Sequence, residues 1–268
     1  MNRTNSPCIV GAFEHPLRKA PNKSVAQLHE ECARGALADA GLTLDHVDGY
    51  FCAGDAPGLG ALSMVDYLGL KLRHVDSTDI GGSSYIAHVA HAAHAISAGK
   101  CNVALITLAG RPRSESYSGT QTRSWGDNVP DAPFELPYRL NTVNSYAMVA
   151  KRHMHEFGTT PEQLAWIKVA ASHHAQHNPN AMLRDLVTVD EVLASPMIAD
   201  PLHRLDCCVV SDGGGAIVVA RPEIARELKR PIVRVIGTGE TIKGQLGGRV
   251  DLTWSGAAWS GRDAFGQA

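Results

Sequence analysis

Short apolar runs of strand type alternate with helical segments through the first third of the chain. The apolar runs occupy residues 8–13, 47–53, 74–78 and 102–110. Helical segments lie between them at 24–41, 59–70 and 79–99. The first helix is predicted to begin after Ser24, with Gln27 as its capping-box partner, and to end at Gly41. This order of elements predicts an α/β fold with a largely parallel sheet that is covered on both faces.

The segment 79–99 is the most distinctive part of this pattern. Its glycine turn opens into a helix built of small residues, which can approach neighbouring backbone closely. The first turn, at Gly82, Ser83 and Ser84, presents unpaired N–H groups and the positive end of the helix dipole. We therefore expect this turn to hold an oxyanion, a thioester carbonyl or a nucleophile. The alternative is that Ser83 simply caps the helix.

The chain then becomes irregular before it returns to strands. Residues 111–141 contain Pro112, Pro130, Pro133 and Pro137, and an irregular stretch of this length is typical of a functional or partner-binding excursion. Helices are expected at 144–157, 160–177 and 189–194. Residues 205–220 predict a strand hairpin or a bent strand broken by glycines, residues 232–239 a further strand, and residues 260–268 a helix that has only just started.

Composition limits the possible classes of protein. The 268 residues, 44% hydrophobic and 19% charged, suffice for one large or two modest domains. A net charge of −2 without basic runs gives no electrostatic case for nucleic acid or an anionic membrane, and no apolar stretch is long enough to cross a bilayer. The six cysteines lack any paired metal-binding spacing, which predicts reduced thiols in a cytoplasmic protein, without disulfides or zinc.

Histidine-rich and glycine-rich motifs suggest other chemistry, but each has a simpler interpretation. His88, His91 and His94 spread over a wide arc of their helix without a carboxylate among them, so we interpret them as core or interface histidines and predict no metal site. A second group of histidines lacks the HExxH metal-binding pattern, and these residues are expected on exposed helix faces: His153, His155, His173, His174 and His177. The run 211–215 has no helix behind it, so it fails as a phosphate loop. The G-x-S-x-G spacing of a serine hydrolase is absent.

Three stretches of the sequence together resemble the thiolase superfamily. They are residues 78–106, which include the glycine turn, residues 201–219 and residues 235–240, and they occur in the order found in that superfamily. The chain is most similar to thiolases of the sterol-carrier-protein-x type, a group that includes acetyl-CoA acetyltransferases and lipid-transfer proteins. Such proteins are dimers of a five-layered αβαβα fold made from two similar halves.

The resemblance also implies a domain organisation. Residues 1–222 correspond to a complete N-terminal half with an excursion at about 111–204, and residues 231–268 to only the start of a truncated C-terminal half. An isolated first half would expose one apolar side of its layers, which monomers rarely leave uncovered. We therefore expect either a fragment of a longer protein or an obligate partner.

The residue at the nucleophile position departs from the superfamily pattern. Thiolases carry an acyl group on a cysteine at the start of this helix, and counting back without gaps from residues 95–99 places Gly82 at that position. Ser83 and Ser84 are rotated away on the helix, and an unactivated serine is a poor nucleophile. Covalent thiolysis is therefore not expected. Gly82, Ser83 and Ser84 are predicted to act only as backbone or hydroxyl donors near the thioester.

Relatives without this cysteine resemble aldolases of steroid degradation, which cleave a β-hydroxyacyl-CoA by retro-aldol chemistry without a covalent nucleophile. The resemblance implies a CoA thioester as substrate, no bound cofactor, a homodimer and an OB-fold partner of the DUF35 type. It places the acid–base groups mainly in the second half. Two alternatives remain open: a catalytically inactive scaffold or acyl-CoA-binding subunit, and an acetyl-CoA acetyltransferase that uses Cys52 or Cys101.

Overall fold

The computed structural model describes residues 5–116, 141–228, 230–243 and 251–268. Two compact units divide the chain: residues 1–115, 211–242 and 256–268 form the first, and residues 116–210 and 243–255 form the second. Most of the irregular stretch expected at 111–141, with Pro130, Pro133 and Pro137, lies outside the described residues.

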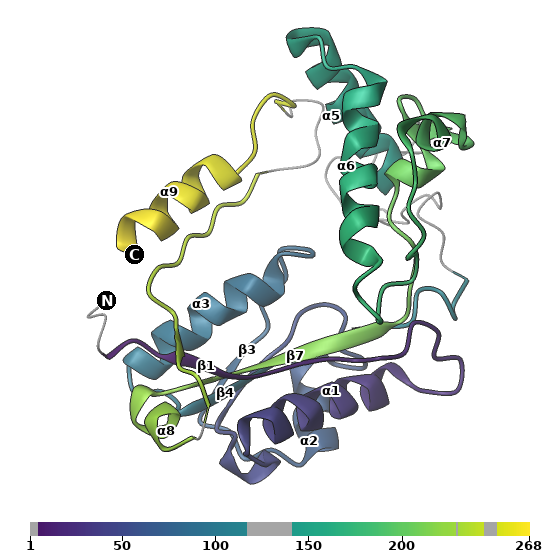
Figure 1. Cartoon of the computed structure of the whole chain (residues 1–268). Coiled ribbons are helices and arrows are strands. Elements are labelled where there is room, and N and C mark those ends of the chain that lie inside the picture. The colour runs from purple at the N-terminus through teal and green to yellow at the C-terminus, as the bar shows by residue number, and fades with distance from the viewer. Residues whose placement is uncertain (1–4, 117–140, 229, 244–250) are drawn as a thin grey trace. The chain divides into compact units, whose positions relative to one another are not determined.

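The first unit contains a sheet with helices on its two faces. Its strands are β1 (Cys8–Glu14), β2 (Gly49–Phe51), β3 (His74–Asp76), β4 (Val103–Gly110), β7 (Gly213–Ala220) and β8 (Val233–Arg234). Its helices are α1 (Val25–Ala40), α2 (Ala61–Leu68), α3 (Ser84–Ser97), α8 (Pro222–Glu227) and α9 (Ala257–Gln267), with a 3-10 helix, η2 (Leu44–His46). Helices α1 and α2 cover one face and α3 covers the other (Figure 1), which confirms the expected α/β layering.

The second unit is mainly helical. Its elements are α5 (Thr142–Phe157), α6 (Pro161–Ala175), α7 (Val189–Ala194), β5 (Met197–Ala199), β6 (Leu202–His203) and the 3-10 helix η4 (Arg204–Asp206). Thr160 and Thr188 each complete a capping box at the start of a helix, so local sequence sets where α6 and α7 begin. The three helices predicted here are confirmed.

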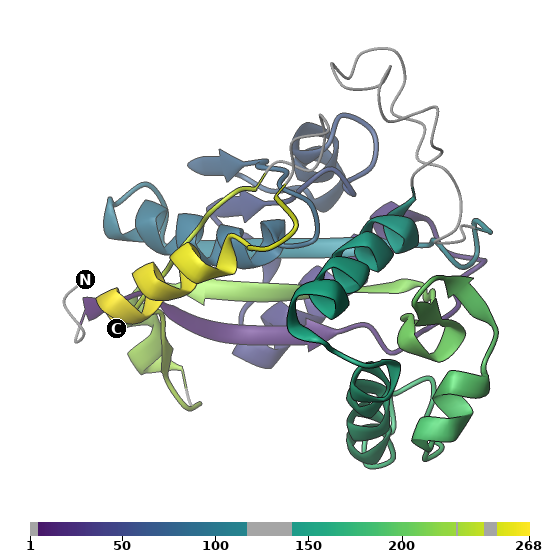
Figure 2. The ribbon, with the colours of Figure 1, turned by 90° about the horizontal axis from the view of Figure 1, so that it is seen from above.

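The six-stranded sheet is mixed, so the prediction of a largely parallel sheet is wrong. Its strand order is β3-β2-β4-β7-β1-β8. The pairs of β2 with β3 and with β4 are parallel, whereas those of β7 with β4 and with β1, and of β1 with β8, are antiparallel. The cause is long-range, because β7 inserts between β1 and β4 (Figure 2). Nothing in the local apolar pattern of a strand specifies that insertion.

Strand β4 shows why its sequence is apolar without alternation. Val103 and Leu105 pack in the core under α1 and α2, and Ala104 and Ile106 pack in the core under α3. Both faces of this strand are therefore buried, and a strand buried on both faces is expected to be apolar throughout.

Two expectations for the last third of the chain need correction. The segment 205–220 is neither a hairpin nor a strand that glycines break: η4 ends at Asp206, and β7 begins at Gly213 and incorporates the glycines. The terminal helix is more than a start, since α9 has 11 residues. Gly237 and Gly239 allow the preceding segment to approach α9, because an added Cβ would lie 2.1 Å from Ala264 O and 1.9 Å from Ser260 O, respectively.

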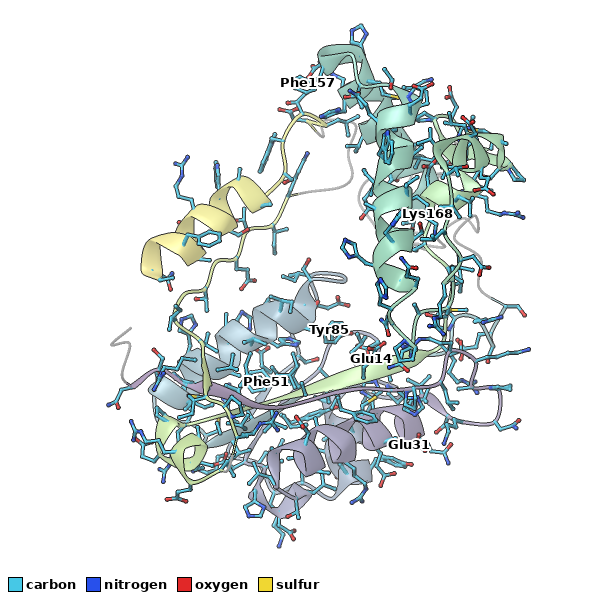
Figure 3. All side chains as sticks on the ribbon, viewed as in Figure 1. Glu14, Glu31, Phe51, Tyr85, Phe157 and Lys168 are labelled. Carbon is cyan, nitrogen blue, oxygen red and sulfur yellow. The ribbon has the colours of Figure 1, made fainter. Side chains whose placement is uncertain are left out.

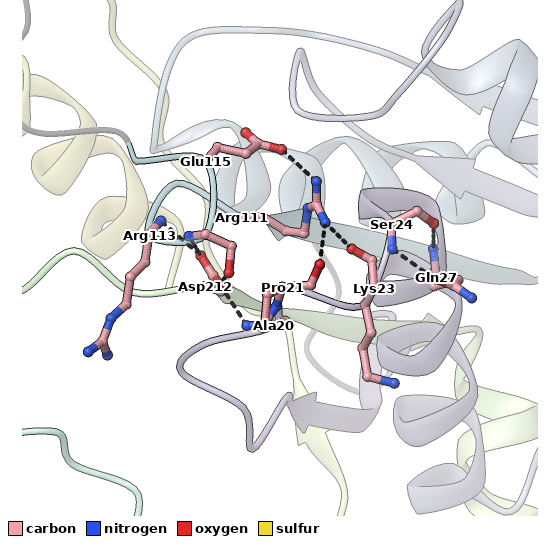
Figure 4. Close-up of polar contacts among 10 residues, drawn as sticks. Ala20, Pro21, Lys23, Ser24, Gln27, Arg111, Arg113, Glu115 and Asp212 are labelled. Carbon is pink, nitrogen blue, oxygen red and sulfur yellow. Dashed lines mark hydrogen bonds and ion pairs between the residues drawn. The ribbon is translucent and has the colours of Figure 1, made fainter.

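The carboxylate of Asp212 accepts hydrogen bonds from two loops of the first unit that are far apart in the sequence (Figure 4). It is 2% exposed and accepts hydrogen bonds from the N–H groups of Ala20 at 2.7 Å, Arg113 at 2.8 Å and Ser114 at 3.0 Å, and from the Ser114 hydroxyl. Burial alone would raise the pKa of Asp212, but these donors outweigh it and hold the pKa below its usual value. The 211–215 run is therefore structural, as its lack of phosphate-loop spacing indicated.

We predict that Asp212→Asn lowers the free energy of unfolding by about 2–3 kcal/mol at pH 7, since it removes charge-assisted hydrogen bonds and buries an amide without matching acceptors. Because the folded-state pKa is depressed, the carboxylate stabilises the fold above its unfolded pKa of about 3.9 and loses this effect as the pH falls through the folded pKa. Urea unfolding between pH 7 and pH 3 should show the two proteins converging in acid. Asp66→Asn, at an exposed position, is the control.

We also predict that Gly11→Ala destabilises the protein by about 1–3 kcal/mol. A Cβ at Gly11 would lie 2.2 Å from the backbone oxygen of Ala36 in α1, which cannot move without disturbing the helix. Gly261→Ala in α9 is the matched control, because its Cβ would meet no atom within 4 Å. Equal urea midpoints for the two variants would contradict the close packing of α1 on β1.

Candidate functional site

The glycine turn before α3 is held in shape by Ser84 rather than by Ser83. The Ser84 hydroxyl is buried, accepts the N–H of Ile80 at 2.9 Å and donates to the carbonyl of Gly81 at 2.6 Å. Gly81 has a φ of +79°, a conformation that favours glycine. Ser83 occupies the N-cap position, but its side chain makes no capping hydrogen bond, so the alternative that Ser83 caps the helix through its hydroxyl is wrong.

The backbone N–H groups of Gly82 and Ser83 come next along the chain. Both residues are exposed, and apart from an isolated bridge between Ile80 and Gly82 their N–H groups donate no hydrogen bond of standard geometry to any residue that the structure describes. Among the three predicted donor residues, Gly82 and Ser83 therefore have an accessible backbone. The hydroxyl of Ser84 is already used in hydrogen bonds within the turn. A Cβ added to Gly82 would meet no atom within 4 Å, so there is room here for a side chain.

Tyr85, in the first turn of α3, is tied to the sheet through a carboxylate that the sequence analysis missed. Its hydroxyl donates to Oδ1 of Asp55, in the loop after β2, and Oδ2 of Asp55 accepts the N–H of Ala109 at 2.9 Å. Nε2 of His29 lies 3.2 Å from the same Oδ2. Burial would raise the pKa of Asp55, but the contacts with His29, Tyr85 and Ala109 lower it. Burial and the adjacent Asp55 raise the pKa of the Tyr85 hydroxyl, so it stays protonated.

The interior end of this chain of polar contacts lies in β2 and β4. Nδ1 of His29, on α1, lies 2.9 Å from the Thr107 hydroxyl, and the Tyr50 hydroxyl lies 2.8 Å from the same oxygen. Tyr50, His29 and Thr107 are fully buried. The chain of contacts therefore connects the first turn of α3 to α1 through the core.

An open apolar depression of about 380 Å³ borders Tyr85. Three strands and α3 line it: Ala12, Phe13 and Glu14 from β1, Ile106 and Leu108 from β4, Gly215, Ala216 and Ile217 from β7, and Tyr85. Figure 3 shows Tyr85 and Glu14 on this side of the sheet. Glu14 is the single charged residue in the lining, and its carboxylate pairs with Arg18. The depression therefore suits an apolar group.

The cysteines offer no replacement for the missing thiol. Cys52 and Cys101 are buried, with burial raising the pKa of each thiol to about 11, and neither lies at the start of α3. A thiol with this pKa is almost entirely protonated at neutral pH and is a weak nucleophile. This argues against the acetyltransferase alternative that uses Cys52 or Cys101.

The structure separates the three histidines of α3. His88 is fully buried and His94 is exposed, while His91 lies between two carboxylates, Asp76 and Glu240. Burial lowers the pKa of His88, and the two carboxylates outweigh burial to raise the pKa of His91. The sequence spacing gave no sign of either carboxylate, because Asp76 comes from β3 and Glu240 from the segment after β8. The second histidine group, at 153, 155, 173, 174 and 177, is exposed as predicted.

Comparisons with known proteins bear on these features. No protein-family model matches the chain. A steroid side-chain-cleaving aldolase of Thermomonospora curvata is 33% identical over 239 residues, which cover 86% of this chain and 60% of that protein. An acetyl-CoA acetyltransferase of Methanothermobacter thermautotrophicus is 29% identical over 225 residues, which cover 82% of this chain and 58% of that protein. The chain thus spans about three fifths of the length of these relatives.

A solved structure of an aldolase is similar to this chain in its fold. An Ltp2–ChsH2(DUF35) aldolase superposes with a TM-score of 0.81 over 94% of this chain and 64% of that chain, at 29% sequence identity. No helix in the described part of the chain has the length and apolarity needed to span a membrane. The sequence resemblance and the α/β layers agree with these relatives, and the chain belongs to the thiolase-like superfamily.

Proposed function

We propose that the chain takes part in retro-aldol cleavage of a carbon–carbon bond in a β-hydroxyacyl-CoA. The observation that carries this proposal is the pair of free N–H groups at Gly82 and Ser83, at the positive end of α3, where glycine stands in place of a nucleophile. An oxyanion donor without a nucleophile suits a reaction that builds negative charge on a thioester oxygen but forms no acyl-enzyme.

The reaction balances without a cofactor. A base removes the proton of the β-hydroxyl group, the Cα–Cβ bond breaks, and the β-carbon leaves as a ketone or aldehyde. The electron pair of the broken bond becomes a thioester enolate, which takes up a proton at Cα. The N–H groups of Gly82 and Ser83 would stabilise the enolate oxygen. The base is not assigned to this turn, because the Ser84 hydroxyl is occupied by Ile80 and Gly81.

The apolar depression supports a hydrophobic acyl group as substrate. Its volume falls within the range of small-molecule sites, and Tyr85 belongs to both its lining and the first turn of α3. A lipid or steroid side chain in the depression would therefore lie beside the turn that binds the thioester. The similarity of most of the chain to a steroid side-chain-cleaving aldolase supports the same substrate class.

We further propose that this activity needs other protein components. The solved aldolase relative is a complex with a DUF35 protein, and an OB-fold protein of this type, together with a second copy of the chain, is the expected assembly. The substrate is a CoA thioester, and no resident cofactor is required. A cytoplasmic setting is consistent with cysteines that are all unpaired.

The test measures ketone release from a steroid-type β-hydroxyacyl-CoA by the chain with and without a DUF35-type protein. We expect release by the complex, and a loss of roughly 10²-fold in Gly82→Val, whose branched side chain would block the free N–H groups. Ser97→Ala, at the other end of α3, should leave the rate unchanged. CoA-ester binding without turnover would instead identify an inactive binding subunit, and thiolysis of acetoacetyl-CoA without ketone release would identify an acetyltransferase.

A separate prediction concerns the electrostatics of the turn. A cysteine introduced as Gly82→Cys should have a thiol pKa below 8.5, and about one unit below that of Ser97→Cys, because the two positions lie at opposite ends of the α3 dipole. The pH dependence of iodoacetamide alkylation, followed by mass spectrometry, measures both values. The background carries Cys207→Ser and Cys208→Ser, since the other four cysteines are buried. Equal midpoints would contradict an electropositive site at Gly82.

A further inference from the structure

Two histidines of α3 and two carboxylates from distant segments form a cluster in the first unit. Nδ1 of His91 lies 2.7 Å from Oδ2 of Asp76, at the end of β3, and Nε2 of His91 lies 2.9 Å from Oε2 of Glu240. His88 is one turn before His91 on the same helix, and their ring centroids are 5.9 Å apart. One ligand atom from each of Asp76, His88 and His91 falls within 4.8 Å of the others.

His88 lacks the hydrogen bonds that a buried imidazole normally makes. The residue is fully buried, yet neither ring nitrogen has a hydrogen-bond partner among the described residues. The Thr78 backbone and Asp76 favour its protonated form, but burial outweighs them and lowers the pKa of His88. The rings of Phe51 and Tyr85 lie beside it, with centroids 5.9 Å and 6.2 Å from that of His88. A neutral imidazole with an unpartnered nitrogen beside a carboxylate is a group suited to bind a metal ion.

Asp76 and His91 are already oriented as ligands. Oδ1 of Asp76 accepts both the N–H of Thr78 at 3.0 Å and the Thr78 hydroxyl at 2.7 Å, which leaves Oδ2 directed at His91. Glu240 accepts from Nε2 of His91, which places a proton on that nitrogen and leaves Nδ1 for a metal. A carboxylate that accepts from the far nitrogen of a ligating histidine is a recurrent feature of zinc sites.

We propose that Asp76, His88 and His91 bind a zinc ion, with Glu240 orienting His91. Two imidazole nitrogens and one carboxylate oxygen match the ligand preferences of zinc, whereas magnesium and calcium prefer oxygen ligands alone. Three protein ligands leave one tetrahedral position open, for water or a substrate oxygen. Binding replaces the proton that Nδ1 of His91 shares with Asp76, so one proton leaves as the ion enters.

The movement needed to close the site is small. Ligand atoms around tetrahedral zinc lie about 3.3 Å apart, so the contact between His91 and Asp76 lengthens slightly and the His88 nitrogen moves inward from at most 4.8 Å. No hydrogen bond of His88 to a described residue has to break for this to happen.

The test is direct titration of the chelator-stripped chain with zinc by calorimetry, and with cobalt(II) by visible absorption. We expect one equivalent to bind and to give the absorption of tetrahedral cobalt. His91→Gln and Asp76→Asn should each weaken zinc binding at least tenfold, and Glu240→Gln by about 10- to 100-fold. His94→Gln is the matched control, on the same helix but exposed, and should bind as the parent does.

Circular dichroism of each variant establishes that it is folded, and the thermal midpoint gives a second readout. Zinc should raise the midpoint of the parent and of His94→Gln, but not that of His91→Gln. The proposal is overturned if the parent binds less than one equivalent of zinc. It is equally overturned if His91→Gln and Asp76→Asn bind zinc as tightly as the parent, which would place the ion on other histidines. Neither readout depends on the proposed lyase activity.

Discussion

A carboxylate that is mostly withdrawn from water must be matched by polar partners, and the geometry of the candidate site depends on how this requirement is met at Asp55, whose side chain is 20% exposed. Its partners come from three elements: the Tyr85 hydroxyl from α3, the Ala109 N–H from β4 and the His29 ring from α1. These contacts fix the first turn of α3 relative to the sheet. These contacts use side chains and a strand N–H, and none of them involves the N–H groups of Gly82 and Ser83.

The same turn suits the proposed retro-aldol reaction, which needs no thiol. The positive end of α3, the left-handed backbone at Gly81 and the support from Ser84 are all present, while Gly82 offers open space instead of a nucleophile. Stabilisation of negative charge needs only the backbone donors, so it is compatible with glycine at this position. Acyl transfer also needs a nucleophile, which glycine lacks. The buried Cys52 and Cys101 cannot compensate, because burial raises the pKa of both thiols.

Helix α3 carries a second polar feature farther along its length. His88 follows Gly82 by six residues, about 9 Å along a helix axis, and His91 joins α3 to Glu240 in the segment after β8. That segment also contacts α9, since the N–H of Thr238 donates to the side chain of Gln267 at 3.3 Å. The cluster is therefore assembled by β3, α3 and the segment after β8, and it links α3 to the last part of the described chain.

The sequence determined most of the local structure, because the relevant forces act over a few residues. Ser24, Thr160 and Gly41 mark helix ends through capping and through the left-handed conformation that glycine adopts readily. The superfamily resemblance and the absence of cysteine at Gly82 were also visible in the sequence, since they depend on residue identity alone. The candidate turn could be located for the same reason.

Only the tertiary structure decided which strands pair and which polar side chains meet. The insertion of β7 between β1 and β4 makes the sheet mixed, and no periodicity within a strand encodes its neighbour. Asp55 and Tyr85 are 30 residues apart, and His91 and Glu240 are 149 apart, so no local spacing could indicate either contact. Hydrogen bonds between such residues form only after packing has brought their elements together, and sequence reasoning therefore found the turn and Ser84 but not Asp55, which ties α3 to the sheet.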